Sequence, residues 1–310
     1  MTSMPSATSP GTTDQAVPFR KIAAAMARGT CQDAGAMRAL VATVVAVGPD
    51  DRLNDAAETL RELGDAGTVR GILISPGDDP APQPNVSGNT VLLRGIKAPY
   101  LNNAVAALRL SSLPTLVWWR GGSEDLLEGL ADLADRIVLD EVEPEGIWRR
   151  AVQYFADSAF SDLRWARLTQ WRALMAHFFD IPEVRAAARQ FTRLHIRASD
   201  PTSARLFAAW LTSSLRFADR FAVDVDHDQA SADGSVLREV TLGNGEQALS
   251  ITYAADAACL ETLVSVHGHR SASRVVSLVN LNLAALMTEE LRIRARDVAL
   301  ERALQALVGA

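Results

Sequence analysis

Residues 39–47 read ALVATVVAV, a continuous apolar and β-branched run that ends at Gly48-Pro49. Such a run predicts a strand buried on both faces, as in a parallel sheet covered by helices. Further strand-like runs lie at residues 69–74, 91–93, 113–119 and 136–139, and helix-like stretches between them lie at 54–63, 100–110 and 124–134. Strands that alternate with helices require crossover connections. We therefore predict an N-terminal three-layer α/β domain with a mostly parallel sheet.

The second half of the chain has a different pattern, because its strand-like runs lie close together. They fall at residues 192–198, 221–225, 236–242, 248–253 and 261–266, and helices are expected at 183–190, 202–217 and 281–307. Asn244-Gly245 between two apolar runs is typical of a hairpin turn. Clustered strands beside helices predict a C-terminal α+β domain with a mixed, partly antiparallel sheet. We expect a disordered tail at 1–15, an N-terminal α/β domain at 16–155, a connecting helical segment at 156–181 and the C-terminal domain at 182–310.

Composition restricts the classes of partner and the compartment. The chain has 310 residues, 48% of them hydrophobic, and a net charge of −6, which is the balance of a globular protein without the basic surplus that nucleic acids or anionic membranes attract. No apolar run is long enough to span a bilayer. Two cysteines, Cys31 and Cys259, are too few for a disulfide framework, so we expect a cytoplasmic protein. The two could still form a redox pair if the fold brings them together; the alternative is two independent thiols.

A search for chemical motifs finds no catalytic constellation, cofactor loop or metal site. The phosphate-binding patterns GxGxxG, GxxxxGK[ST] and GxSxG are absent from the chain. Gly121-Gly122-Ser123 follows a predicted strand and precedes a predicted helix, where backbone N–H groups could bind an anion. The alternative is a tight turn in which Ser123 caps the helix. His267-Gly268-His269 and the acidic run Asp224 to Asp228 are expected in a surface loop and a solvated turn.

The most distinctive stretch is residues 161–180, SDLRWARLTQWRALMAHFFD. Its apolar residues at helical spacing form one face of a predicted helix: Leu168, Trp171, Leu174, Met175 and Phe178. Trp and Arg are enriched where proteins bind partners, and three arginines here could contact an acidic partner or a phosphate. The alternative is a helix packed between the domains. We therefore select Arg164, Trp165, Arg167, Trp171, Arg172, Trp118 and Trp119 as partner-binding or interdomain residues.

LRWARLTQWR at residues 163–172, followed by Phe178-Phe179-Asp180, resembles the central signature of the OpcA family of glucose-6-phosphate dehydrogenase assembly proteins. LPTLVWW at 113–119 and AAWL at 208–211 are similar to further segments of that family. The chain departs from the family pattern in two places. The region before Ala39 differs from it, and Arg120 stands where proline is expected. The resemblance implies a non-catalytic accessory protein, without a cofactor, that binds the dehydrogenase, promotes its active oligomer and activates it.

Two other functions remain open from the sequence. One is an enzyme or sensor that binds a sugar phosphate near Gly121 and the arginines of the tryptophan stretch. The other is a purely structural protein that forms oligomers. The sequence leaves self-association undecided.

Overall fold

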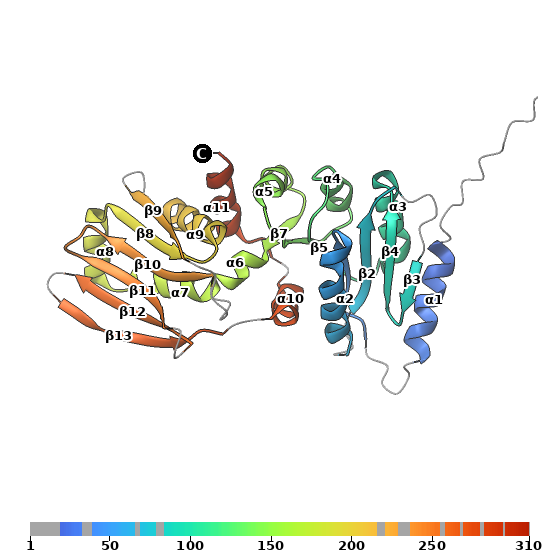
Figure 1. The fold of residues 1–310 in the computed structure, drawn as a ribbon, viewed down its shortest axis with the longest axis horizontal. Coiled ribbons are helices and arrows are strands. Elements are labelled where there is room, and N and C mark those ends of the chain that lie inside the picture. The colour runs from blue at the N-terminus through green and yellow to red at the C-terminus, as the bar shows by residue number, and fades with distance from the viewer. Residues whose placement is uncertain are drawn as a thin grey trace, which may run out of the picture.

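The computed structural model describes residues 19–32, 39–65, 69–78, 84–215, 221–228, 236–254, 258–266, 269–279, 282–293 and 295–309. The predicted tail at 1–15 lies outside these ranges. The strand predicted from ALVATVVAV is β1 (Ala42–Val47), and all six of its residues are buried. It lies at the middle of a seven-stranded sheet, sheet A, with the order β3-β4-β2-β1-β5-β6-β7. Figure 1 labels β3, β4, β2, β5 and β7 of this sheet, in that order from right to left.

Sheet A is parallel except at one edge. Its other strands are β2 (Val69–Pro76), β3 (Pro84–Ser87), β4 (Thr90–Ile96), β5 (Thr115–Trp119), β6 (Arg136–Leu139) and β7 (Ala159–Asp162). Only β3 runs antiparallel, paired with β4 through a tight turn in which Gly88 has φ +53°. Strand β3 was not predicted, because a run of four residues that begins with a proline gives too weak a strand signal.

Helices cover both faces of sheet A, which confirms the predicted three layers. One face packs on α1 (Phe19–Gln32), α3 (Ala98–Leu108), α4 (Leu126–Ala131) and α5 (Glu145–Val152), and the other packs on α2 (Asp50–Asp65) and α10 (Leu283–Arg292). The two paired tryptophans illustrate the division, because Trp119 belongs to the first apolar cluster and Trp118 to the second. Helices α1 and α5 were not predicted.

Sheet B has the order β13-β12-β11-β10-β8-β9. Its strands are β8 (Arg193–Ala198), β9 (Ala222–His227), β10 (Leu237–Gly243), β11 (Ala248–Ala254), β12 (Cys259–Val266) and β13 (His269–Ser277). Only β8 and β9 are parallel, so the predicted mixed sheet is confirmed. The acidic run predicted as a turn is instead strand β9. Of the His267-Gly268-His269 group, only His269 is described, as the first residue of β13.

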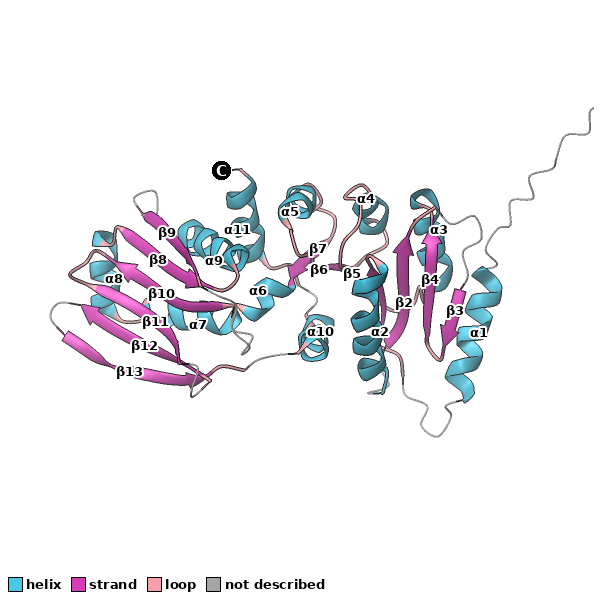
Figure 2. Cartoon of the chain, in the orientation of Figure 1, coloured by secondary structure: helices cyan, strands magenta, loops and turns pink. Residues whose placement is uncertain are grey.

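Four helices accompany sheet B: α7 (Thr169–Phe178), α8 (Pro182–Ala187), α9 (Pro201–Ser214) and α11 (Val298–Val308). The single closing helix predicted at 281–307 is wrong: α10 ends at Arg292, and Asp297 begins α11 as its N-cap. Figure 2 shows these two helices apart, with α10 beside sheet A and α11 beside α9. Among the described residues, no helix combines the length and apolar character that crossing a bilayer requires.

Residues 156–181 are not one helical segment. Strand β7 contributes Ser161 and Asp162 to sheet A, the short helix α6 (Leu163–Arg167) follows, and α7 begins after Leu168. The predicted apolar face from Leu168 to Phe178 is buried, as expected. The domain boundaries stay a prediction.

Candidate functional site

The tryptophan stretch lies where the chain passes from sheet A to sheet B. Asp162 ends β7 and caps α6: one carboxylate oxygen accepts from the Arg164 backbone N–H at 2.7 Å, and the other accepts from Trp148 Nε1 at 2.8 Å. The Asp162 side chain is completely buried. Burial raises its pKa, against the opposing charge of Arg164 and the hydrogen bond from Trp148. Asp162 thus fixes the point at which the chain leaves sheet A.

Arg164 joins three segments that are far apart in the sequence. Its guanidinium donates to the backbone oxygens of Glu141 and Val142, after β6, and its Nε donates to Asp200 Oδ2 at 3.3 Å. Asp200 is also the N-cap of α9, since Thr202 N–H donates to it. Only 14% of the Arg164 side chain is exposed. Arg164 is therefore engaged between the two halves of the molecule.

Trp165 and Arg172 form the centre of this region. The Arg172 guanidinium carbon lies 3.5 Å from the centroid of the Trp165 ring, and Trp210 of α9 meets that ring edge-on at 6.4 Å. Trp165 Nε1 donates to Asp297 Oδ2, the N-cap of α11, at 2.7 Å. Burial lowers the pKa of Arg172 to about 10, although the charge of Asp297 opposes this. We call Asp162, Arg164, Trp165, Arg172, Trp210 and Asp297 the junction cluster.

The other selected residues of the stretch differ in their surroundings. Trp171 is 1% exposed and belongs to the apolar core. Arg167 is half-buried, and burial lowers its pKa while Asp140 and Asp162 raise it. Within the described part of the chain, Arg167 makes no hydrogen bond or ion pair. It is thus the arginine of the stretch that the fold leaves unpaired.

A second region lies at the carboxyl ends of the parallel strands. In sheet A, β2 and β4 lie on one side of β1, and β5, β6 and β7 lie on its other side. The direction in which the chain adds strands therefore changes between β1 and β5, and open α/β sheets bind ligands in the crevice at such a point. A cavity of about 690 Å³ lies there, lined by Gly48, Arg120, Gly121, Gly122, Ser123 and other residues. The sheet therefore has the order of a nucleotide-binding fold.

Among the described residues that line the crevice, the two basic side chains, Arg52 and Arg120, are both already paired with Asp140. Arg120 is buried beneath the crevice, where its guanidinium stacks on Trp118 at 4.6 Å and its Nε donates to Asp140 at 3.0 Å. The same guanidinium donates a hydrogen bond to Asp55. Burial alone would raise the pKa of Asp55, but the hydrogen bond and the charge of Arg120 lower it. The remaining charged lining is mostly acidic: Asp51, Asp78, Glu141 and Glu143.

The turn selected as an anion site faces these acids. Gly121 and Gly122 have φ of +135° and +137°, a conformation that favours glycine. Ser123 is exposed, and helix α4 begins three residues later, with no side-chain cap. Burial raises the pKa of Glu141, with Trp119 opposing the shift and Glu124 adding to it. This geometry favours a tight turn over an anion-binding one.

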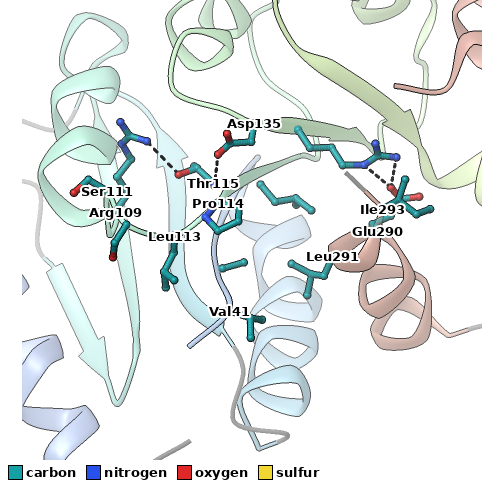
Figure 3. Close-up of a pocket in the computed structure, with 14 residues that line it drawn as sticks. Val41, Arg109, Ser111, Leu113, Pro114, Thr115, Asp135, Glu290, Leu291 and Ile293 are labelled. Carbon is teal, nitrogen blue, oxygen red and sulfur yellow. Dashed lines mark hydrogen bonds and ion pairs between the residues drawn. The ribbon is translucent and has the colours of Figure 1, made fainter. Parts of the chain in front are cut away.

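A pocket of about 470 Å³ lies at the opposite, amino-terminal edge of sheet A (Figure 3). Val41, Leu113 and Pro114 form one wall, and Leu291 and Ile293 at the end of α10 form the other. Arg136 and Glu290 form a buried ion pair of 2.8 Å beside it. The ion pair joins the chain's last segments to sheet A. No sequence signal selected this pocket.

The remaining candidates are scattered. Cys259 is buried and free, and the side chain of Cys31, at the end of α1, lies outside the described residues. His195 bonds Asp226 at 2.9 Å, and His177 bonds Asp180 at 3.0 Å. Within the described ranges, no three His, Cys, Asp or Glu side chains gather closely enough to hold a metal ion.

Sequence reasoning missed Asp162, Asp200, Trp210 and Asp297 as members or partners of the junction cluster. Asp200-Pro201 did signal a helix start, but nothing in the sequence paired Asp200 with Arg164, 36 residues earlier. Fold and site together define a two-sheet α/β protein whose switch-point crevice is lined mostly by acids and whose halves meet at a tryptophan–arginine cluster.

Comparison with known proteins shows similarity over the second half of the chain. Residues 158–304 match the family model described as the C-terminal domain of a glucose-6-phosphate dehydrogenase subunit. The chain is 29% identical over 147 residues to a protein of Nostoc punctiforme named OpcA for the OxPP cycle, and 29% identical over 126 residues to its namesake in Synechocystis. The resemblance to the OpcA family is thus confirmed over residues 158–304.

The extent of these matches is limited. They cover 44% and 38% of this chain but only 30% and 26% of the Nostoc and Synechocystis proteins. Among solved structures, levoglucosan dehydrogenase in complex with NADH and L-sorbose is 8% identical, with a TM-score of 0.45 over 86% of this chain and 91% of that one. A likeness that distant bears on neither activity nor ligand.

Proposed function

We propose that this chain is a non-catalytic accessory protein that binds glucose-6-phosphate dehydrogenase, promotes its active oligomer and activates it allosterically. The observation that carries the proposal is the match of residues 158–304 to a domain described as part of a subunit of that dehydrogenase. As part of the same proposal, the complex forms in the cytoplasm, a reducing compartment that suits a free thiol such as Cys259.

The acidic lining of the crevice supports a role without catalysis. A dinucleotide at the switch point of a doubly wound sheet needs close backbone approach and a helix N-terminus open to its phosphates. Here Asp50 and Asp51 begin α2, and Arg120 is held beneath the crevice by Asp140 and Asp55. The same acids disfavour the alternative function, an enzyme or sensor that binds sugar phosphates.

The junction cluster supplies a rigid support for a partner surface. An activator works by binding the active state of its target more tightly than the inactive state, and a thousandfold preference corresponds to about 4 kcal/mol. We assign the buried tryptophans, Arg164 and Arg172 to holding the two sheets. Arg167, which has no partner in the described chain, is assigned to contact with the dehydrogenase.

The test is to mix the full chain with the cognate dehydrogenase and to follow complex formation by mass photometry. Arg167→Ala is expected to weaken the complex about tenfold, in line with the loss of a charged contact. Arg185→Ala, an exposed arginine on α8, is the matched control and should leave binding unchanged. No complex at micromolar concentrations would refute the proposal, and equal binding by the two variants would refute the role of Arg167 alone.

A further inference from the structure

One face of sheet B has no described helix on it. Helices α7, α8 and α9 pack on the other face, through residues such as Leu194, Ile251 and Leu260, and Figure 1 shows α7 and α8 behind the strands. On the face without a described helix, the two central strands β10 and β11 present side chains that are small or uncharged, apart from Glu239. We call this surface the open face.

Strand register arranges the open face in three rows that cross β12, β11, β10 and β8. The first row is Glu261, Thr252, Glu239 and Arg197; the second is Leu263, Ser250, Thr241 and His195; the third is Ser265, Ala248, Gly243 and Arg193. The central positions of the second and third rows hold the smallest residues: Ser250, Thr241, Ala248 and Gly243. A second flat surface could therefore approach closely at the middle of the sheet.

Charges on the open face are separated by strand. Basic residues lie on β8, acidic residues lie on its neighbour β9, and Glu261 lies on β12, on the far side of the uncharged β11. Arg197 is already within 3.5 Å of Glu239 and 3.9 Å of Asp228, yet 46% of its side chain is exposed. It can thus accept a further acidic neighbour from above the sheet.

We propose that the open face binds the open face of a second copy of this chain, about a two-fold axis that runs along the strands between β10 and β11. This axis places β12 of one copy over β8 of the other and keeps each residue at the height of its own row. Glu261 then lies opposite Arg197 of the second copy, and by symmetry the pair forms twice. Ser250 lies opposite Thr241, and Ala248 lies opposite Gly243.

The second arrangement that keeps the strands of the two copies aligned is electrostatically unfavourable. A two-fold axis perpendicular to the strands would stack β8 on β8, with Arg193 opposite Arg197, and β9 on β9, with aspartates opposite aspartates. Like charges placed directly opposite each other destabilise an interface. Charge complementarity therefore selects a second copy in the arrangement along the strands.

The size of the open face sets the expected affinity. Six strands of six to nine residues give a face of roughly 650 Å² in projection on each copy, which lies near the lower limit for a specific interface. The small polar residues at its centre also favour a hydrated contact. We expect a dimer that dissociates at micromolar concentrations, and this expectation does not depend on the proposed dehydrogenase partner.

Sedimentation velocity on the full chain alone, from about 1 to 200 µM, tests the dimer. Glu261→Arg and Arg197→Glu should each raise the dissociation constant at least about tenfold, since each places like charges opposite each other. The double variant exchanges the charges and should return the constant to within about threefold of the wild type. Glu62→Arg on the exposed face of α2 is the control and should behave as wild type.

Arg197→Glu also places a negative charge beside Glu239 and Asp228 of the same sheet and so could disturb the fold. A third variant, Ser250→Arg, avoids this problem. Ser250→Arg places a bulky side chain at the centre of the open face and should abolish the dimer, while circular dichroism and the melting temperature show whether the chain is folded. A wild-type chain that is monomeric at 200 µM, or a dimer indifferent to both Glu261→Arg and Ser250→Arg, would overturn the proposal.

Discussion

Asp297 binds two separate parts of the molecule with one carboxylate. It caps α11 through the N–H groups of Ala299 and Leu300, and it accepts from the buried Trp165 Nε1. Asp297→Ala should lower the free energy of unfolding by about 2–4 kcal/mol, because a cap is lost and a buried donor is left unpaired. Asp297→Asn keeps one oxygen to cap α11, but its NH2 group then faces the N–H of Trp165, so it should recover only the cap, about 1 kcal/mol of that loss. Urea titrations of both variants check this; equal losses would contradict the contribution of the cap.

Arg120 and Arg94 offer a matched comparison of a buried and an exposed ion pair. Arg120 is 3% exposed beside Asp140, whereas Arg94 and Asp50 are 49% and 59% exposed. Arg120→Ala should lower the free energy of unfolding by about 2–3 kcal/mol, because it leaves the Asp140 carboxylate with only its longer, 3.5 Å ion pair to Arg52. Arg94→Ala should cost less than about 1 kcal/mol. Similar losses in thermal or urea unfolding would show that the crevice does not depend on Arg120.

Asp162 gives the junction cluster a pH dependence of known sign. Burial raises its pKa above the ordinary value of 3.8, so the native state takes up a proton before the unfolded state as the pH falls. Stability relative to Asp162→Asn should therefore increase as the pH drops through the raised pKa, until both states are protonated. Urea unfolding of both proteins between pH 7 and pH 4 measures the difference. A difference that stays constant or shrinks would contradict the assignment.

At the scale of elements, α10 is the segment that returns from sheet B to sheet A. Leu286 and Met287 enter the apolar cluster beneath β1 and β5, and Glu290 pairs with buried Arg136. Glu290→Ala should lower the free energy of unfolding by about 3 kcal/mol and increase hydrogen exchange across α10. Its neighbour Glu289 is exposed, so Glu289→Ala should change neither. Unchanged exchange in Glu290→Ala would show that the ion pair does not hold α10.

Elements with a strong local pattern could be predicted from sequence, and those that depend on tertiary contacts could not. The apolar runs of β1 and β5 and the helical spacing of α7 correctly indicated buried elements. The break between α10 and α11 was missed because apolar residues continue at helical spacing on both sides of Asp297. Two partners outside the local sequence, Arg136 and Trp165, bind the two sides of that break.

At the scale of the whole molecule, the sequence identified the segment that joins the sheets but not how it joins them. Trp165 and Arg172 were selected from residue type and spacing. Their partners Trp210 and Asp297 lie 45 and 132 residues after Trp165 in the chain, and contacts at such separation leave no periodic signal. The pairing of Arg120 at the crevice was also invisible in sequence, since nothing near Arg120 indicates that it binds Asp55 and Asp140.

The central claim is that this chain activates glucose-6-phosphate dehydrogenase by binding it. The direct measurement is the initial rate of the dehydrogenase at a fixed, subsaturating substrate concentration, titrated with the full chain and, in parallel, with Arg167→Ala. We predict a saturable rise in rate with a midpoint in the micromolar range or below, shifted about tenfold higher for the variant. A rate unchanged at every concentration, with the dehydrogenase active and the chain folded, would contradict the claim.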